Sequence, residues 1–297
     1  MSAKLSWEVD GADWPNRDSS RFVEAAGFRW HVQTMGRGPV ALLVHGTGAA
    51  THSWRRLMPL LAPRFTVIAP DLPGHGFTDM PSSSRLSLPA MARDLASLCG
   101  ALDIRPEIAI GHSAGAAVLA RMAIDGLIEP KLIVSLNGAF LPFGGVAAQF
   151  LSPLAKAMTL NPIVPRLFAW RGRDPSAVRR LIKGTGSTVN AEGERLYGKL
   201  VGNSGHVGAA LHMMANWDLQ PLVRDLPKLR CPLLLVAAAN DRAVPPGVAG
   251  RVHQLVPNSE LRSIAGLGHL AHEERPEAIA GMILENTLRP LDVQTSI

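Results

Sequence analysis

The chain has 297 residues, of which 47% are hydrophobic and 18% charged, and its formal net charge is +6 at pH 7. This length and hydrophobic content suffice for one large α/β domain, so we expect no second core. No stretch approaches the roughly 18 uncharged apolar residues of a transmembrane helix, so we expect at most a peripheral attachment to a membrane. Residues 1–17 are polar and lack an apolar segment, so we expect no signal peptide.

Only two cysteines are present, Cys99 and Cys231, and their spacing suggests neither a disulfide framework nor a metal site. We expect both to be thiols in the core of a protein from a reducing, cytoplasmic compartment. The sequence predicts no metal and no cofactor.

The first part of the chain alternates between strands and helices. A hairpin is expected from residues 21–24 and 28–34, around Ala26-Gly27. The pattern then predicts strands near residues 40–44, 65–69, 106–110 and 131–136, and helices at residues 52–61, 89–102 and 114–125. Such alternation is typical of a mostly parallel sheet with helices on both faces.

The alternation stops after Asn137-Gly138. Residues 139–220 contain apolar helical pieces interrupted by prolines and no strand, and the sheet resumes at Cys231. A long insertion of this kind is typical of a cap that shapes a substrate pocket. We therefore expect a core of residues 1–138 and 221–297 and a helical cap of residues 139–220. The last elements are strands at 233–237 and 261–264 and helices at 247–255 and 277–286.

Ser113 lies in the sequence Gly111-His112-Ser113-Ala114-Gly115, which joins an apolar strand to a helix-forming run. Small residues around it allow the strand to turn sharply into the helix, and G-x-S-x-G in that context is typical of a nucleophile elbow. The helix dipole places partial positive charge beside the hydroxyl. We expect Ser113 to be a nucleophile; a purely structural glycine turn is the alternative.

An acid and a histidine follow the serine in the order that a Ser-Asp-His triad of this type requires. Asp241 follows the strand at 233–237, and His269 lies in a glycine-containing loop after the strand at 261–264. The carboxyl ends of the strands in an open α/β sheet gather functional groups at one edge. We expect Asp241 and His269 to be the acid and the base, and His272, the competing histidine, to lie at the entry of the next helix.

A loop for an oxyanion follows the strand at 40–44. Its sequence is His45-Gly46-Thr47-Gly48, and we expect the backbone N–H groups of Thr47 and Ala114 to form an oxyanion hole. A phosphate-binding P-loop is the alternative, but no lysine follows in the required place.

These motifs together resemble the α/β-hydrolase superfamily, and a further match is the D-x-x-G-x-G loop from Asp71 to Gly76. The resemblance implies a mostly parallel, eight-stranded sheet with helices on both faces and a helical cap insertion. A serine at position 113 argues against the aspartate-nucleophile members, such as haloalkane dehalogenases and epoxide hydrolases.

Segments outside the catalytic motifs resemble the BchO family of magnesium-chelatase accessory proteins of bacteriochlorophyll biosynthesis. They include residues 13–17, 29–32, 45–54, 141–143 and 268–274. This resemblance implies a role in a photosynthesis pathway, with a tetrapyrrole-related substrate or a magnesium-chelatase subunit as partners. It does not name a bond that is cleaved.

The expected cap is rich in large apolar residues, which favours a bulky apolar substrate over a sugar. Packing of the cap helices on one another is the competing explanation for such residues. The candidate pocket residues are His45, His112, Phe140, Phe143, Met213, Met214 and Trp217.

Charge is concentrated in the same region, where residues 139–225 contain ten Lys and Arg against five Asp and Glu. Such a basic rim attracts anions, whether a carboxylate-bearing tetrapyrrole, an acidic partner or the surface of a photosynthetic membrane. A solvated basic face is the alternative. No recognition motif accompanies the charge, so we expect no nucleic-acid partner.

The sequence therefore predicts a serine hydrolase in which Ser113 attacks a carbonyl, His269 transfers the proton and Asp241 orients the imidazole. A non-catalytic binder or chaperone for a tetrapyrrole or a chelatase subunit is a second hypothesis. A generic carboxylesterase or haloperoxidase-like hydrolase is a third.

Overall fold

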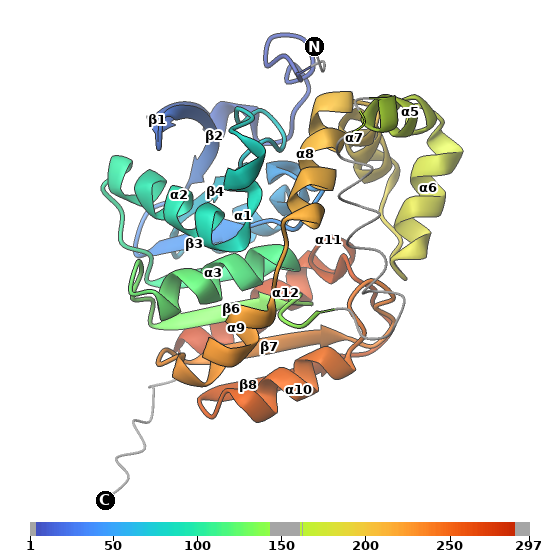
Figure 1. Cartoon of the computed structure of the whole chain (residues 1–297). Coiled ribbons are helices and arrows are strands. Elements are labelled where there is room, and N and C mark those ends of the chain that lie inside the picture. Colours follow the sequence, from blue (N-terminus) through green and yellow to red (C-terminus); the bar gives the residue numbers. More distant parts are fainter. Residues whose placement is uncertain (1–3, 143–160, 162, 289–297) are drawn as a thin grey trace, which may run out of the picture.

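The computed structural model describes residues 4–142, 161 and 163–288 and contains one eight-stranded sheet (Figure 1). The strand order is β1-β2-β4-β3-β5-β6-β7-β8; β2 pairs antiparallel with β1 and β4, and all other pairs are parallel. This confirms the predicted mostly parallel sheet. The strands are β1 (Ser20–Ala25), β2 (Phe28–Met35), β3 (Val40–Val44), β4 (Thr66–Pro70), β5 (Ile108–His112), β6 (Leu132–Leu136), β7 (Leu233–Ala238) and β8 (Ser259–Ile264).

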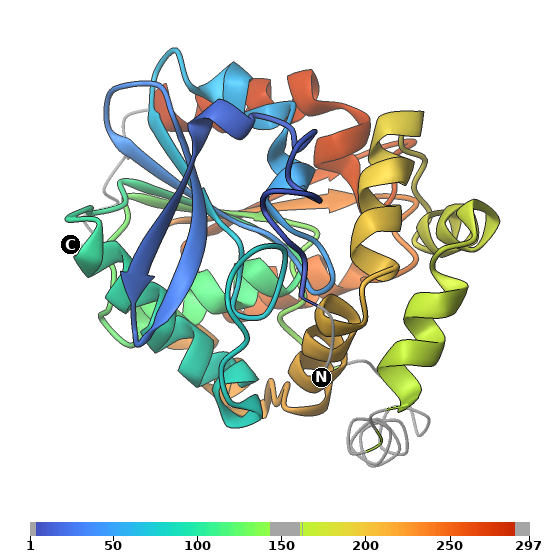
Figure 2. The same cartoon turned by 90° about the horizontal axis from the view of Figure 1, so that it is seen from above.

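Helices cover both faces of the sheet because its central strands are apolar on both sides. Alternate residues of β3 point in opposite directions: Leu42 packs with α2 (Leu88–Ala101) and α3 (Ala114–Ile124), whereas Leu43 packs with α1 (Leu57–Leu61) and α12 (Pro276–Leu288). Figure 2 shows these two groups of helices on opposite sides of the sheet. The short helix α10 (Gly247–Leu255) belongs to the same side as α2 and α3.

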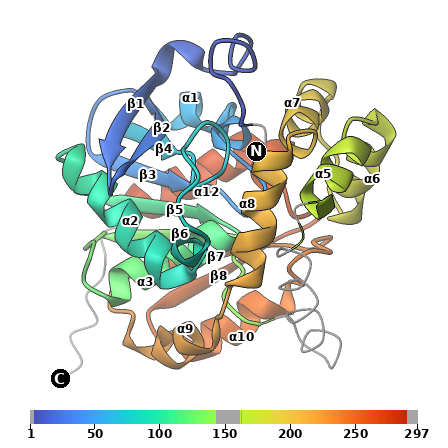
Figure 3. The same cartoon turned by 45° about the horizontal axis from the view of Figure 1, so that its top comes forward.

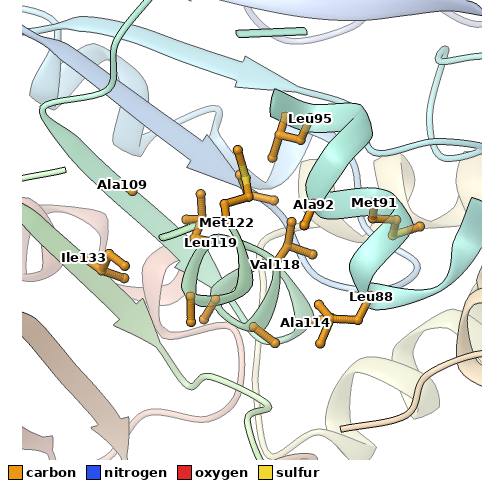
Figure 4. Close-up of a cluster of buried hydrophobic side chains, with 14 of the residues drawn as sticks. Leu88, Met91, Ala92, Leu95, Ala109, Ala114, Val118, Leu119, Met122 and Ile133 are labelled. Atoms are coloured by element: carbon orange, nitrogen blue, oxygen red, sulfur yellow. The ribbon is translucent and has the colours of Figure 1, made fainter. Parts of the chain in front are cut away.

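The core between α2, α3 and the sheet fixes the helix that begins beside Ser113. Val118, Leu119 and Met122 of α3 are fully buried and pack against side chains of α2 such as Met91 and Leu95 (Figure 4). Their apolar area is removed from water, which stabilises the fold by about 25 cal/mol for each Å² buried. The start of α3 is therefore held rigidly against the sheet.

Between β6 and β7 the described chain forms helices and no strand. We refer to α5 (Ile163–Arg171), α6 (Pro175–Gly184), α7 (Ala191–Val201) and α8 (Ser204–Ala215) as the inserted helices. In Figure 3, α5, α6 and α7 lie together at the right of the molecule, and α8 runs nearer the middle of the view. A short helix, α9 (Gln220–Asp225), and the 3-10 turn Leu226–Lys228 lead back to β7. The division into a core and a cap at residues 139 and 220 stays a prediction.

Two predicted elements differ from the observed ones because of prolines. The helix expected at 52–61 is divided into a 3-10 turn, Thr51–Trp54, and α1. Pro59 lies in the first turn of α1, and an earlier start would require the backbone N–H that proline lacks. The strand expected at 106–110 begins at Ile108, since Pro106 has no N–H for the ladder.

The remaining expectations concern the thiols and the membrane. Cys99 is buried in α2, Cys231 is half-buried before β7, and both are free. Burial raises the pKa of the Cys99 thiol to about 12, which leaves it protonated and unreactive. Within residues 4–142 and 163–288, no helix has the length and apolar content needed to cross a bilayer.

Candidate active site

Ser113 occupies the turn between β5 and α3, in a backbone conformation that few side chains adopt. Its φ is 51° and its ψ is −118°. Two glycines make the turn possible by close backbone contact: a Cβ on Gly111 would lie 2.4 Å from the Ala116 nitrogen, and one on Gly115 would lie 2.1 Å from the Val44 carbonyl oxygen. Strained serines of this kind cost about 1–3 kcal/mol and cluster at functional sites.

His269 and Asp241 lie in the loops that follow β8 and β7, and they form a buried pair. The Nδ1 atom of His269 lies 2.7 Å from Oδ2 of Asp241. The other carboxylate oxygen of Asp241 accepts the backbone N–H groups of Ala243 and Val244, both at 2.8 Å. The carboxylate is therefore fixed, and it favours the imidazole tautomer that carries its proton on Nδ1 and leaves Nε2 as an acceptor.

Asn137, at the end of β6, joins the two loops, and this role was not predicted from the sequence. Its amide nitrogen donates to the carbonyl oxygen of His269 at 2.8 Å, and its amide oxygen accepts the N–H of Ala238 at 2.8 Å. Asn137 has a positive φ of 50°, which asparagine tolerates better than most residues. In the sequence, the only indication of this role is that Asn137 directly follows an apolar strand and precedes a glycine.

Ser113 and His269 line the same cavity. No hydrogen bond joins the Ser113 hydroxyl to the His269 imidazole in this structure, so the structure shows the His–Asp half of the expected relay and places the serine beside it. Catalytic hydrogen bonds of this type are often long without substrate and tighten only when it is bound.

Two backbone N–H groups beside Ser113 are available to a ligand. Neither the N–H of Thr47 nor that of Ala114 donates a hydrogen bond to any residue that the structure describes. Ala114 is the first residue of α3, where the N–H groups have no partner within the helix. The loop of Thr47 lies against the elbow: a Cβ on Gly46 would lie 2.9 Å from the Cβ of Ser113. Unbonded backbone N–H groups are the donors that stabilise a negative oxygen in acyl transfer.

The cavity above Ser113 has a volume of about 440 Å³ and is bounded mostly by the inserted helices. Two of the predicted pocket residues, His112 and Met214, are on its wall. The other lining residues come mainly from α5 to α8, and few of them were predicted from the sequence. They include Phe168, Arg171, Val178, Leu181, Ile182, Tyr197, Val201, His206, Val207, Ala210, Leu211 and Leu270.

Four other predicted pocket residues do not line this cavity. His45 is completely buried and accepts the N–H of Leu72 at 2.9 Å. Phe140 and Met213 are completely buried in the core beside α3, and Trp217 packs against that core. Core packing therefore accounts for all four. Phe143 lies outside the described residues.

Two further buried histidines lie beside the His269 pair, and burial lowers the pKa of both. The pKa of His112 falls well below its usual value, and that of His272 falls to about 3, with nearby histidines adding to the effect. His112 Nε2 lies 2.9 Å from the carbonyl oxygen of His269, whereas His272, in the short helix α11 (Ala271–Glu274), packs on the His112 ring at 4.4 Å. Both are therefore neutral packing partners of the loop that carries His269.

The loop between α6 and α7, residues 185–188, contacts both the Asp241 loop and the His269 loop. The carbonyl oxygen of Thr185 accepts the N–H of Arg242 at 3.1 Å and that of His269 at 3.3 Å. Ser187 Oγ accepts the N–H of Leu270 at 2.8 Å. The inserted helices therefore bound the cavity and also hold the backbone of the candidate base. Nothing in the sequence indicated this contact.

A buried ion pair adds a second link between the inserted helices and the His269 loop. Glu273 accepts the Tyr197 hydroxyl at 2.7 Å and pairs with the Arg55 guanidinium at 2.5 Å. Burial raises the pKa of Glu273 against the opposing effect of Arg55. Tyr197 also lines the cavity. A buried pair of this kind contributes little net stability, but removing one partner costs several kcal/mol, so it fixes the geometry of α7 on the core.

The residues that the structure describes include no group of three or more His, Cys, Asp or Glu side chains placed to hold a metal ion. The chemistry that they can support in the cavity is that of a hydroxyl, a neutral imidazole paired with a carboxylate, and two backbone donors.

This fold and this geometry agree with a family model. The model of the alpha/beta hydrolase family matches residues 41–282, and the chain belongs to that family. Over 276 residues it is also 38% identical to the protein named "Magnesium-chelatase 30 kDa subunit" of Rhodobacter capsulatus, with 92% of this chain and 96% of that protein covered. The predicted resemblance is thereby confirmed.

More distant relatives include named hydrolases. The chain is 28% identical over 269 residues to a 2-hydroxy-6-oxo-2,4-heptadienoate hydrolase of Pseudomonas putida, covering 88% of this chain and 93% of that one. Among solved structures, the epoxide hydrolase CorEH superposes with a TM-score of 0.77 at 22% identity, over 91% of this chain and 99% of that one. At that identity the likeness shows the fold alone.

Proposed function

We propose that the protein is a serine hydrolase that cleaves an ester or a related carbonyl compound with a bulky apolar body. One observation carries the proposal: a strained serine, the unbonded N–H of Thr47 and an imidazole paired with a carboxylate line one cavity, and the unbonded N–H of Ala114 directly follows the serine. A strained serine, an unbonded backbone N–H group or a His–Asp pair alone can have a purely structural role. Their convergence at one cavity is what acyl transfer requires.

In the proposed reaction, Ser113 Oγ attacks the carbonyl carbon of the substrate while His269 Nε2 takes the hydroxyl proton. Asp241 accepts a hydrogen bond from the Nδ1–H of His269 and so stabilises the imidazolium that forms. The carbonyl oxygen becomes an anion, and the N–H groups of Thr47 and Ala114 donate to it. His269 then passes its proton to the leaving group, and a water molecule releases the acyl group by the same steps in reverse order.

The lining of the cavity supports an apolar substrate. Leucine, isoleucine, valine and methionine side chains from α6 and α8 form much of its wall. We propose that residues 139–220 act as a cap on the core of residues 1–138 and 221–297. In this arrangement the core supplies the reacting groups, and the cap selects the substrate.

The likeness to the Rhodobacter capsulatus protein supports a role for this hydrolase beside magnesium chelatase. Within that role, the substrate is an apolar compound related to a tetrapyrrole, and a chelatase subunit is a candidate partner. The hydrolase acts in the cytoplasm, where it contacts the photosynthetic membrane peripherally.

Labelling with a fluorophosphonate probe tests the nucleophile. The probe reacts with an activated serine, so we expect it to modify the protein at Ser113 and to leave the Ser113→Ala variant unmodified. Ser97→Ala is a matched control, because Ser97 lies on α2 away from the cavity and its hydroxyl only donates to the Arg93 carbonyl oxygen. Equal labelling of the wild type and the Ser113→Ala variant would remove Ser113 from the role.

A second candidate is a non-catalytic carrier of a tetrapyrrole or a chelatase subunit. The observation that favours it is the missing hydrogen bond between Ser113 and His269. Complementation separates the two functions. A strain that carries the Ser113→Ala protein at normal level loses bacteriochlorophyll if the reaction is needed and keeps it if the protein only binds.

A further inference from the structure

The outer surface of α5 is apolar, although it faces solvent. Ile163 is 63% exposed, Leu167 is 53% exposed and Trp170 is 67% exposed. At about 100° for each residue, the three side chains lie within about 60° of one another on the helix. We call these three residues the α5 stripe. Isolated exposed apolar residues are ordinary, but a stripe that includes a tryptophan marks a surface that contacts another phase or molecule.

Basic residues flank the α5 stripe. Arg166 and Arg171 lie on either side of it on the same helix, and Arg173 follows at the end. Helix α6 adds Arg179, Arg180 and Lys183, whereas Asp174 is the only acidic residue between positions 163 and 184. All six cations are exposed.

Most of this positive charge is not neutralised by the protein. Arg179 pairs with Glu194 at 3.6 Å and Arg180 with Asp174 at 3.6 Å. Arg166, Arg173 and Lys183 form no ion pair with any residue in the described part of the chain. An apolar stripe with tryptophan, bordered by unpaired arginines, matches an anionic lipid surface, where the side chains enter the interface and the cations meet phosphate groups.

The mouth of the cavity opens beside the α5 stripe. Three large apolar residues both line the cavity and are substantially exposed: Phe168 of α5 at 48%, Leu181 of α6 at 56% and Met214 of α8 at 57%. These side chains therefore form the rim, and α5 contributes to the rim and to the stripe at once. In Figure 3, α5 and α6 lie at the outer side of the molecule, where a flat surface can reach them.

We infer that the α5 stripe and the basic residues around it dock the protein on an anionic bilayer, with the cavity mouth beside the lipid. An apolar substrate dissolved in the membrane then reaches Ser113 without crossing water. The use of the cavity by the substrate rests on the proposed function, whereas the docking does not.

Sedimentation of the full chain with vesicles tests the docking. We expect the protein to bind vesicles of phosphatidylcholine with phosphatidylglycerol and to bind pure phosphatidylcholine weakly. Leu167→Glu or Trp170→Glu should reduce binding roughly tenfold or more, since each removes apolar contact and adds a repelled charge. Leu127→Glu is the matched control, because Leu127 is 38% exposed in the turn after α3, outside the inserted helices.

Charge is tested separately from apolar contact. Arg173→Glu should weaken binding to the anionic vesicles and make it less dependent on salt, whereas Arg251→Glu, on α10, should not. Equal losses in the test and control variants would overturn the proposal, and so would failure of the wild type to bind the anionic vesicles. A dimer in solution that Leu167→Glu dissociates would also overturn it, in favour of a second copy of the chain on the stripe.

Activity on a water-soluble ester keeps the two proposals apart. Leu167 and Trp170 do not line the cavity, so their variants should hydrolyse the ester at the rate of the wild type when no vesicles are present. Normal fluorophosphonate labelling without vesicle binding would reject the docking alone. Vesicle binding without labelling would reject the hydrolase alone.

Discussion

Two buried His–Asp pairs occur among the residues that the structure describes, and they have the same short contact. In the first, His269 Nδ1 lies 2.7 Å from Asp241; in the second, His31 Nδ1 lies 2.7 Å from Asp71. The second pair even has a serine, since His31 Nε2 lies 3.0 Å from the Ser20 hydroxyl. Judged by hydrogen bonds alone, Ser20-His31-Asp71 is the more complete relay.

Their surroundings distinguish the two sets. His31 and Asp71 are completely buried, and neither lines the cavity over Ser113. Asp71 also accepts the N–H groups of Thr51 and Phe77, so it ties the D-x-x-G-x-G loop to its neighbours. Burial raises the pKa of Asp71, but the charge and hydrogen bond of His31 outweigh it and hold that pKa well below its usual value. We conclude that access to a cavity, a strained serine and free backbone donors define the candidate site better than the relay does.

The largest expected effect is the difference in turnover between the Ser113→Ala and Ser20→Ala variants. Ser113→Ala should lower the turnover of an activated ester roughly 10⁴-fold or more, as the loss of a nucleophile does in serine hydrolases. Ser20→Ala removes a hydroxyl that only bonds to His31, so its turnover should stay within about twofold of the wild type. Steady-state kinetics of both variants measure this. A large loss from Ser20→Ala would mean that the second set does the chemistry.

The two carboxylates should differ in what they affect. Asp241→Asn favours the wrong imidazole tautomer, so turnover should fall about 10³- to 10⁴-fold, and the loss of stability should be smaller than that of Asp71→Asn because the His269 imidazole lines the cavity. Asp71→Asn breaks a buried pair, so the free energy of unfolding should fall by roughly 3–5 kcal/mol while folded molecules stay active. Denaturant unfolding measures the stability of each variant, and the rate per folded molecule measures its turnover. Equal losses of stability and of turnover in the two variants would contradict the expected difference.

The loop at residues 185–188 predicts a third, smaller effect. Gly186 has a φ of +84°, and a Cβ there would lie 1.9 Å from the carbonyl oxygen of Asn240. Gly186→Ala should therefore displace the Asp241 loop and lower kcat about 10- to 100-fold, with little change in the KM of a small ester. Gly184→Ala is the matched control, since a Cβ there has no neighbour within 4 Å. Equal kinetics in both variants would show that the loop does not position the pair.

The smallest expected effect is in the dependence of stability on pH. Burial lowers the pKa of His272 to about 3 and that of His206 to about 4. Between these values and about pH 6.5, the unfolded chain binds more protons than the folded chain, so the free energy of unfolding should decrease as the pH falls. The Asp71 pair loses its contribution only below the ordinary carboxyl pKa of about 3.9.

Denaturant unfolding between pH 7 and pH 4.5 measures this effect. His272→Phe removes one titrating group and should flatten the curve, whereas His253→Phe, at the exposed surface of α10, should not. If the slope is unchanged in the His272→Phe variant, folding does not lower the pKa of the His272 imidazole in the wild type.

The candidate site was predictable from sequence where a residue lies in the turn or loop that follows a strand. Ser113, Asp241 and His269 come after β5, β7 and β8, and parallel strands bring their carboxyl ends to one edge of the sheet whatever the details of packing. Fold class and element order were predictable because the central strands, such as β3 and β7, are continuous apolar runs.

The cavity wall was not predictable in this way. Met213 and Met214 are neighbours on α8, yet Met213 is completely buried in the core and Met214 lines the cavity. Successive helical residues point about 100° apart, so the rotation of α8 about its axis decides which one meets the substrate. Likewise, the hydrogen bonds of Thr185 and Tyr197 to the His269 loop depend on how the insertion folds back, which no local pattern encodes.

The carbonyl oxygen of Thr185 has a consequence for protein engineering. Exchange of lids between related enzymes assumes that a lid is a separable module which alters specificity and spares the chemistry. Here one backbone atom of the insertion binds the loops of both Asp241 and His269. A chimera that receives a foreign lid would therefore need to retain residues 185–188, or the grafted enzyme would lose its catalytic rate together with its old specificity.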